Sequence, residues 1–279
     1  MTLSFFTSNG DDLVPTDLAC SLWSPDQMHG VALSGALARS LEQAVAAVGR
    51  SELRPTRYTV DLFRPARMAP CTISTTIVRE GPRLLLLDAT LTQGERAVAR
   101  ASAVYLRPTE QATGQVWEPD TSFSPPPLDL APISDRPRVP LFFSERIGWS
   151  PSFADHQNGD RKMTWQTGVP VLPGESLSGF VAAASVADAA SMVTNWGSRG
   201  VEHINSDITL TLARTPVSLE IGLAAVDRVS ADGIATGTVT VFDRQGRLGT
   251  AVVSALANAR RSVDFEVHDF SNDPRATGA

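Results

Sequence analysis

The chain of 279 residues is longer than an average domain and suits two domains of modest size. Its hydrophobic content of 42% is enough to build a full core. A formal net charge of -6 argues against nucleic-acid binding, which needs a basic face, and the two cysteines are too few for a disulfide framework.

No segment of the sequence indicates export or a membrane span. The start, "MTLSFFTSNGDDLVP", lacks the basic residues and the long apolar run of a signal peptide. The run "LLLL" at residues 84–87 is too short for a membrane helix and is predicted to be a buried strand. We therefore expect a soluble, cytoplasmic protein with neither nucleic acid nor a membrane as a partner, and we leave a homo-oligomer open.

Residues 30–48 begin the first set of predicted elements. Their apolar and small side chains have helical spacing between Gly30 and Gly49. The alternating stretch "RYTVDLFRPARMAP" follows as a strand. "VREGPRLLLLDATLT" and "QGERAVARASAVYL" then supply further strands joined by turns, so the order is one helix and roughly four antiparallel strands.

A Pro-rich stretch, residues 107–140, comes next and is predicted to cross the surface with little regular structure. We assign residues 107–162 to this connector. The order of elements then repeats: a helix over residues 179–194, the strand "SDITLTLARTP", and the segments "VSADGIATGTVTVFD" and "QGRLGTAVVSALAN". Gly179 lies 149 positions after Gly30, and Arg214 lies 150 positions after Arg64. Such constant offsets indicate an internal repeat.

A long Ala-rich helix wrapped by a curved antiparallel sheet describes the hotdog fold, since small side chains let the sheet approach the helix closely. We therefore predict an α+β double hotdog, in which two such units are related by a pseudo-twofold axis and their sheets join edge to edge. The predicted domains are an N-terminal hotdog (1–106), the connector, a C-terminal hotdog (163–262) and a loosely held polar tail (263–279).

The stretches "HGVALSGALARSLE", "TVDLFRPARMAP", "VADAAS" and "INSDITLTLARTP" resemble the type II acyl-CoA thioesterase family, in its actinobacterial double-hotdog branch. The resemblance covers about residues 20 to 260 apart from much of the connector. It implies hydrolysis of an acyl-CoA or acyl-carrier thioester by activated water, without a cofactor.

Asp188 is the first candidate site residue. It is the only acid between Glu175 and Glu202, in a helix otherwise made of small and apolar residues. A buried carboxylate is costly unless it is used or paired, although Asp188 facing solvent remains the alternative. The resemblance implies that Asp188 is the catalytic base.

The resemblance implies two further catalytic positions. Alternation in "DITLTLAR" puts Asp207, Thr209 and Thr211 on one face of the strand, and Thr209 falls where the family has a hydroxyl that holds the attacking water. A packing role for Thr209 is the alternative, and Asp207 and Asn205 are neighbours of less certain role. The family's third residue, a Gln, falls at Val253 or Ser254 and is missing here, so Ser254 is the candidate substitute.

His29, Gly30 and Val31 open the first helix, where unpaired amides can polarise a thioester carbonyl. His29 and Asp188 also match the layout of hotdog dehydratases, so a dehydratase or isomerase stays open, as does a non-catalytic acyl-binding protein. His29 within hydrogen-bond reach of Asp188 would favour the dehydratase, whereas Thr209 beside Asp188 with His29 turned away would favour the hydrolase. The four histidines and the cysteines show no metal-ligand spacing, and we predict no metal site.

Overall fold

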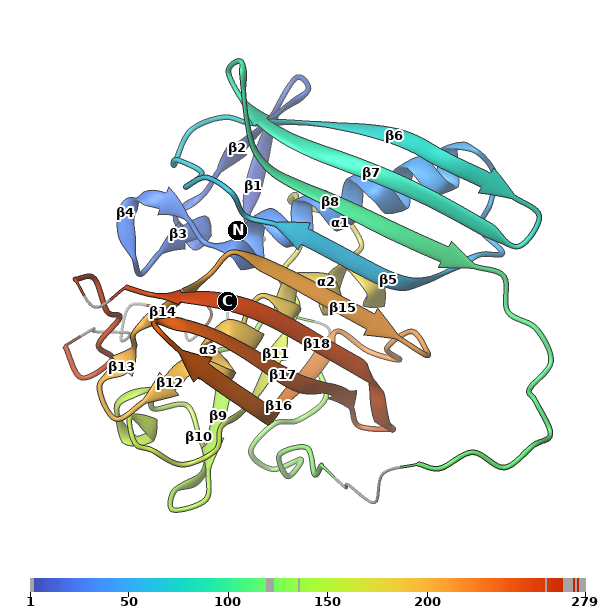
Figure 1. The fold of residues 1–279 in the computed structure, drawn as a ribbon. Coiled ribbons are helices and arrows are strands. Elements are labelled where there is room, and N and C mark those ends of the chain that lie inside the picture. The colour runs from blue at the N-terminus through green and yellow to red at the C-terminus, as the bar shows by residue number, and fades with distance from the viewer. Residues whose placement is uncertain are drawn as a thin grey trace.

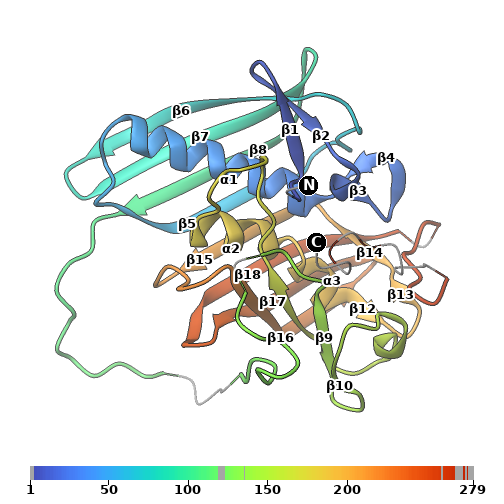
Figure 2. The ribbon, with the colours of Figure 1, turned by 180° about the vertical axis from the view of Figure 1, so that it is seen from behind.

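The computed structural model describes residues 3–118, 123–134, 136–258 and 260–267, together with Asp273 and Arg275. The predicted polar tail therefore lies largely outside the described residues, as does His268. The described residues form a 12-stranded antiparallel sheet that runs through both halves of the chain. Helices cover one face of the sheet: they lie behind it in Figure 1 and in front of it in Figure 2.

The N-terminal half supplies one long helix and one end of the sheet. Its helix is α1 (Gly30–Ala47), and its sheet strands are β5 (Arg54–Asp61), β6 (Thr72–Gly81), β7 (Leu84–Gln93) and β8 (Arg96–Leu106), in the order β5-β8-β7-β6. Two small sheets precede α1, formed by β1 (Phe6–Asn9) with β2 (Asp12–Pro15) and by β3 (Cys20–Ser21) with β4 (Ser24–Met28), and the 3₁₀ turn η1 (Asp17–Ala19) links them.

The C-terminal half supplies the other end of the sheet. Its strands are β11 (Met163–Thr167), β15 (Asp207–Leu212), β16 (Glu220–Ala231), β17 (Ile234–Asp243) and β18 (Gly246–Ala257), and β14 (His203–Asn205) also pairs with β18. The helices of this half are α2 (Gly179–Ala187) and α3 (Ala190–Asn195), followed by the two-stranded sheet of β12 (Trp196–Gly197) and β13 (Gly200–Val201).

The connector contains more regular structure than the sequence predicts. Strands β9 (Leu141–Ser144) and β10 (Gly148–Ser150) extend the sheet beyond β11, and the 3₁₀ turn η2 (Ala154–His156) follows them. The reason is that the apolar run "LFFS" buries Leu141 and Phe142 while pairing with the edge of β11. Only the earlier part, residues 107–118, leaves the body of the molecule as an extended loop (Figure 1).

The predicted single helix over residues 179–194 is interrupted at Asp188 and Ala189. The amides of Asp188 and Ala189 donate to carbonyls three residues back, those of Ser185 and Val186, at 3.4 and 2.9 Å. These tighter bonds replace the regular i to i−4 ladder, so the helix is divided into α2 and α3. The side chain of Asp188 leaves the helix at this break.

Helices α1 and α2 pack against each other through small side chains. The hydroxyl of Ser34 donates to the carbonyl of Ala184 at 2.6 Å, and that of Ser185 donates to the carbonyl of Val31 at 2.8 Å. A Cβ at Gly35 would lie 3.0 Å from the Ser185 hydroxyl. Backbones this close require Gly, Ala and Ser, which explains the composition of both helices.

The two halves of the sheet meet where β5 pairs with β15. Thr59 pairs with Thr209, and the flanking pairs are Tyr58 with Leu210 and Val60 with Ile208. The hydroxyls of Thr59 and Thr209 lie 3.1 Å apart. The stretches "RYTVDLFRPARMAP" and "SDITLTLARTP" therefore supply neighbouring antiparallel strands at the centre of the molecule.

Candidate active site

The carboxylate of Asp188 lies at the break between α2 and α3, directly against the N-terminus of α1. A Cβ built on Gly30 would come within 2.3 Å of Asp188 Oδ1, so only glycine fits at this position. The backbone amide of Val31 donates a hydrogen bond to the carboxylate, and Asn205 Nδ2 donates another to Oδ1 at 2.9 Å. The positive end of the α1 dipole also faces this negative charge.

The electrostatics of Asp188 suit a group that exchanges a proton near neutral pH. Burial raises the pKa of Asp188 to about 6, and the hydrogen bonds from Asn205 and Val31 oppose this rise because they favour the charged form. The carboxylate is thus mostly ionised at neutral pH, yet basic enough to accept a proton from water.

Asp188 opens into a pocket with a volume of about 450 Å³. Val31 and His29 from the start of α1, Asn205 from β14 and Met192 from α3 line it beside Asp188. The apolar part of the wall includes Phe5, Leu18, Trp23, Phe142, Phe153 and Phe265, and the polar part also includes Asp17, Gln166, Asp273 and Arg275. A pocket of this size, with both apolar and polar parts to its wall, suits a small ligand that has an apolar portion and a polar reacting group.

Both ring nitrogens of His29 are engaged by the backbone. Nδ1 accepts a hydrogen bond from the amide of Ala32 at 3.0 Å, so Nε2 carries the proton that is donated to the carbonyl of Leu18 at 2.8 Å. Burial lowers the pKa of His29 to about 4, which keeps the ring neutral. His29 is the N-cap of α1, and its nitrogens are directed away from Asp188.

The side chain of Thr209 does not lie beside that of Asp188. Its neighbours Ile208 and Leu210 are fully buried on the helix-facing side of the sheet, so Thr209 lies on the opposite face and meets Thr59. The alternation of "DITLTLAR" was correctly predicted, whereas the expected proximity of Thr209 to Asp188 is wrong. The physical reason is that an apolar face turns toward the core.

Ser254 and Asp207 also lie away from the pocket. Ser254 is exposed on the outer face of β18, and its amide donates to Asp207 Oδ1 at 2.9 Å. The other candidate position for the absent Gln, Val253, is fully buried in the core. Neither Asp207 nor Ser254 lines the pocket that contains Asp188.

Asn205 is the site residue whose role the sequence left uncertain. It lies on the short strand β14, separated from β15 by Ser206, and this separation allows Asn205 to face the pocket although Thr209 does not. Asn205 pairs in register with Ala255 of β18. A signal was present in the sequence: "INSD" places a run of polar residues immediately before an apolar strand.

Within the part of the chain that the structure describes, no group of three or more His, Cys, Asp or Glu side chains could hold a metal ion. The same residues contain no helix whose length and apolar character would let it cross a membrane.

Residues 21–106 match the family model of the acyl-CoA thioesterase N-terminal domain. This part of the chain is therefore similar to the N-terminal domain of acyl-CoA thioesterases. A search among curated proteins gave no match. The family match covers α1 and its strands, the part of the chain that supplies His29 and Val31 to the pocket.

Solved structures similar to this chain span both of its halves. The TesB protein of Mycobacterium avium subsp. paratuberculosis is 16% identical, with a TM-score of 0.62 over 90% of this chain and 95% of that chain. A putative thioesterase II from Thermobifida fusca is 16% identical, with a TM-score of 0.63 over 92% and 98%. A hotdog-fold protein from Alicyclobacillus acidocaldarius is 19% identical, with a TM-score of 0.60 over 90% and 95%. The α+β hotdog fold predicted from the sequence is thereby confirmed.

Proposed function

We propose that this protein hydrolyses acyl thioesters and that Asp188 is the general base. The observation that carries the proposal is the placement of one partly buried carboxylate, with a pKa raised to about 6, in an apolar pocket against the N-terminus of a helix. The names of the similar proteins agree with an acyl thioester substrate such as an acyl-CoA.

In this mechanism Asp188 takes a proton from a water molecule as the water oxygen bonds to the thioester carbonyl carbon. The negative charge that develops on the carbonyl oxygen is met by the amide of Gly30, which is the first helical residue and has no acceptor within the helix. When the tetrahedral intermediate collapses, the carbon–sulfur bond breaks, and Asp188 returns its proton to the leaving thiolate. The amide of Val31 and the side chain of Asn205 hold the carboxylate in place.

We propose further that the chain is a double hotdog with a pseudo-twofold axis through the Thr59–Thr209 pair. These residues are 150 positions apart and contact each other, as residues on a twofold axis must. Ser34 and Ala184 bond across the same offset. In this division, the N-terminal hotdog ends near residue 106, and β9 belongs to the C-terminal hotdog.

The two halves differ in charge at the equivalent site, which supports one active site in each chain. Arg39 occupies the position in α1 that Asp188 occupies in the second half, and its Nε donates to Glu175 at 2.6 Å. A paired arginine cannot serve as a base, so the position aligned with Asp188 carries no carboxylate. Glu42, further along α1, lies beside Ser178 at the N-terminus of α2, and burial raises its pKa.

The engagement of His29 argues against the dehydratase alternative. Such a reaction requires a histidine that gains and loses a proton near the substrate, and both nitrogens of His29 are held by the backbone. We propose that the absence of the family's Gln slows hydrolysis and does not change the type of reaction. Loss of one positioned donor costs about 10²- to 10³-fold in rate.

The decisive experiment is the release of free thiol from a panel of acyl-CoA thioesters, compared between the natural protein and Asp188→Asn. Thiol release that depends on Asp188 supports the proposal. Binding of acyl-CoA without any release would instead favour a non-catalytic acyl-binding protein.

A further inference from the structure

The wall of the pocket follows one face of α3 away from Asp188. Asp188 and Met192 both line the pocket and are one helical turn apart, and Trp196 caps the helix one turn further on. At a rise of 1.5 Å per residue, the distance along the helix from Asp188 to Trp196 is about 12 Å. The pocket therefore extends from the carboxylate toward the surroundings of Trp196.

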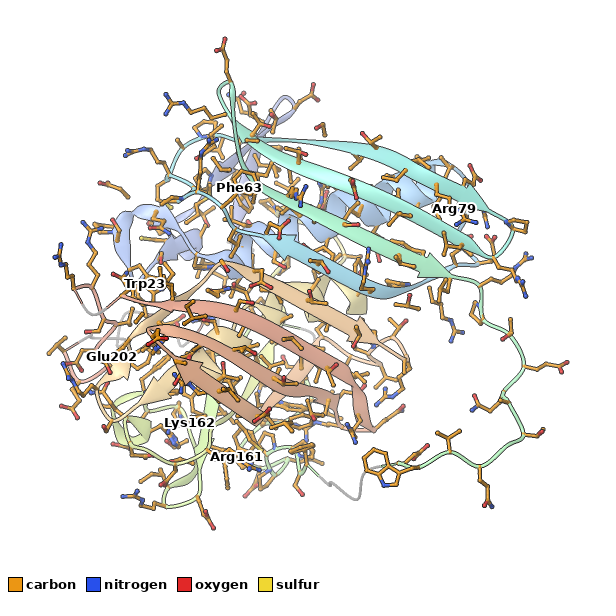
Figure 3. All side chains as sticks on the ribbon, viewed as in Figure 1. Trp23, Phe63, Arg79, Arg161, Lys162 and Glu202 are labelled. Atoms are coloured by element: carbon orange, nitrogen blue, oxygen red, sulfur yellow. The ribbon has the colours of Figure 1, made fainter. Side chains whose placement is uncertain are left out.

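An aromatic cluster closes this far end. The ring of Trp196 lies 5.3 Å from that of Phe142 and 4.8 Å from that of Phe265, and Phe153 lies 4.7 Å from Phe265. The three phenylalanines line the pocket. Trp23, labelled in Figure 3, lies in the turn between β3 and β4 of the N-terminal half. It packs against the same cluster.

Phe265 reaches the pocket on a segment that follows the last strand of the sheet. Val201 and Val263 exchange backbone hydrogen bonds at 2.9 and 3.0 Å. Gln157 holds the next two residues: Nε2 donates to Asp264 Oδ1 at 2.9 Å, and Oε1 accepts from the amide of Phe265 at 2.8 Å. Gln157 itself does not line the pocket, so its bonds serve the placement of this segment.

We propose that residues 263–267, here called the C-terminal strap, form the end wall of the acyl pocket, and that Phe265 sets the length of the acyl chain that fits. The inference rests on the proposed function in one respect, that the ligand is an acyl thioester reacting at Asp188. About 12 Å accommodates roughly ten bonds of an extended chain, since such a chain advances about 1.2 Å per bond.

The physical basis of the selection is apolar burial. Each methylene that enters the pocket should tighten binding by about fourfold, until the chain end meets the ring of Phe265. Beyond that point a longer chain must bend or leave methylenes in water, so affinity should stop increasing. Gln157 acts as a positioning residue because it holds the strap without contacting the chain.

The test measures binding of saturated acyl-CoA thioesters of increasing chain length by calorimetry, in an Asp188→Asn background that prevents turnover. Phe265→Ala in this background should leave short chains bound as before and move the end of the affinity increase to longer chains. Gln157→Ala should make the chain length at which the affinity increase ends less sharply defined, although it removes no residue that lines the pocket. Val267→Ala, at an exposed strap position, is the matched control and should change nothing.

An unchanged chain-length limit in Phe265→Ala and in Gln157→Ala would overturn the proposal, as would the absence of binding for every chain length. If Phe265→Ala fails to fold, Phe265→Leu keeps the test open, because its smaller side chain should move the limit in the same direction. Thiol release by the natural protein is measured separately. A limit that moves in a protein that releases no thiol supports the strap and refutes hydrolysis.

Discussion

Gly30 and Asp188 lie so close together that a methyl group on Gly30 would come within 2.3 Å of Asp188 Oδ1. The contact joins the first residue of α1 to the break between α2 and α3, so the N-terminal half supplies the surface on which the carboxylate of the C-terminal half rests. The candidate site exists only where the two halves meet.

Gly30→Ala should therefore inactivate the protein with little loss of overall folding. The methyl group must displace the Asp188 carboxylate, and a misplacement of about 1 Å can cost ~10²-fold in rate. Steady-state thiol release and thermal unfolding measure the two effects. Gly114→Ala is the control, since a Cβ there has nothing within 4 Å. Full turnover in Gly30→Ala would show that the carboxylate need not occupy this position.

Asn205→Ala should move the pH dependence of the reaction. The hydrogen bond from Asn205 favours the charged carboxylate and lowers the pKa of Asp188. Without it the pKa should rise by about one to two units, the equivalent of ~1.5–3 kcal/mol for a hydrogen bond to a charged group. The rise of kcat/KM with pH should shift upward by the same amount. Ser206→Ala, at the adjacent exposed residue, should keep the original profile; an identical profile in Asn205→Ala would exclude a role for Asn205.

Thr209→Val should leave turnover within about twofold of the natural protein, because its hydroxyl meets Thr59 on the face of the sheet opposite to the helices. The cost should appear in the free energy of unfolding, at about 1 kcal/mol for one lost hydrogen bond. Thr59→Val should behave in the same way. A loss of turnover in Thr209→Val but not in Thr59→Val, with folding preserved, would show that Thr209 has a catalytic role.

The sequence predicted the order and faces of the main strands, because the period of two along a strand depends on local residues. It could not predict the break at Asp188. The pattern "AAASVADAAS" is continuous for a helix, and the break accompanies the contact with Gly30 in the other half. The prediction that Thr209 lies beside Asp188 failed for a related reason. Alternation shows which residues share a face of the strand, but which residue lies beside Asp188 depends on where the strand begins. Ser206 divides β14 from β15, and Asn205 reaches the pocket in its place.

Ala255→Gln should raise the rate of hydrolysis, whereas Ser254→Gln should not. Ala255 is buried on the helix-facing side of β18 and pairs in register with Asn205, so an amide placed there starts next to the Asp188 site. Ser254 is exposed on the opposite face. Thiol release by both variants, with thermal unfolding as the check on packing, makes the comparison. A gain in Ser254→Gln, or none in a well-folded Ala255→Gln, would contradict the assignment of faces.

Asp188→Asn should nearly abolish turnover while preserving acyl-CoA binding, because the carboxylate acts as the base and contributes little to holding the apolar chain. We expect a fall in kcat of at least about 10²-fold, the lower end of the range for general acid–base catalysis. In the natural protein, kcat/KM should rise through pH 6 with the ionisation of Asp188 and then level off.

The same substitution should stabilise the fold at neutral pH. The folded pKa of Asp188 is raised from 3.8 to about 6, so the folded protein binds more protons than the unfolded chain between these values. The stability contributed by the protonated form is therefore complete below pH ~4 and is lost as the pH rises through ~6, by at most about 3 kcal/mol.

His29 changes the stability in the opposite direction. Its pKa is lowered from 6.5 to about 4, so its contribution is lost as the pH falls through this range. In the natural protein the two slopes oppose each other between about pH 4 and 6, and Asp188→Asn removes the slope that Asp188 contributes. Denaturant unfolding across this range should show that Asp188→Asn loses more stability on acidification than the natural protein does. Parallel profiles for the two proteins would mean that Asp188 is not the buried, proton-exchanging group on which the proposed mechanism depends.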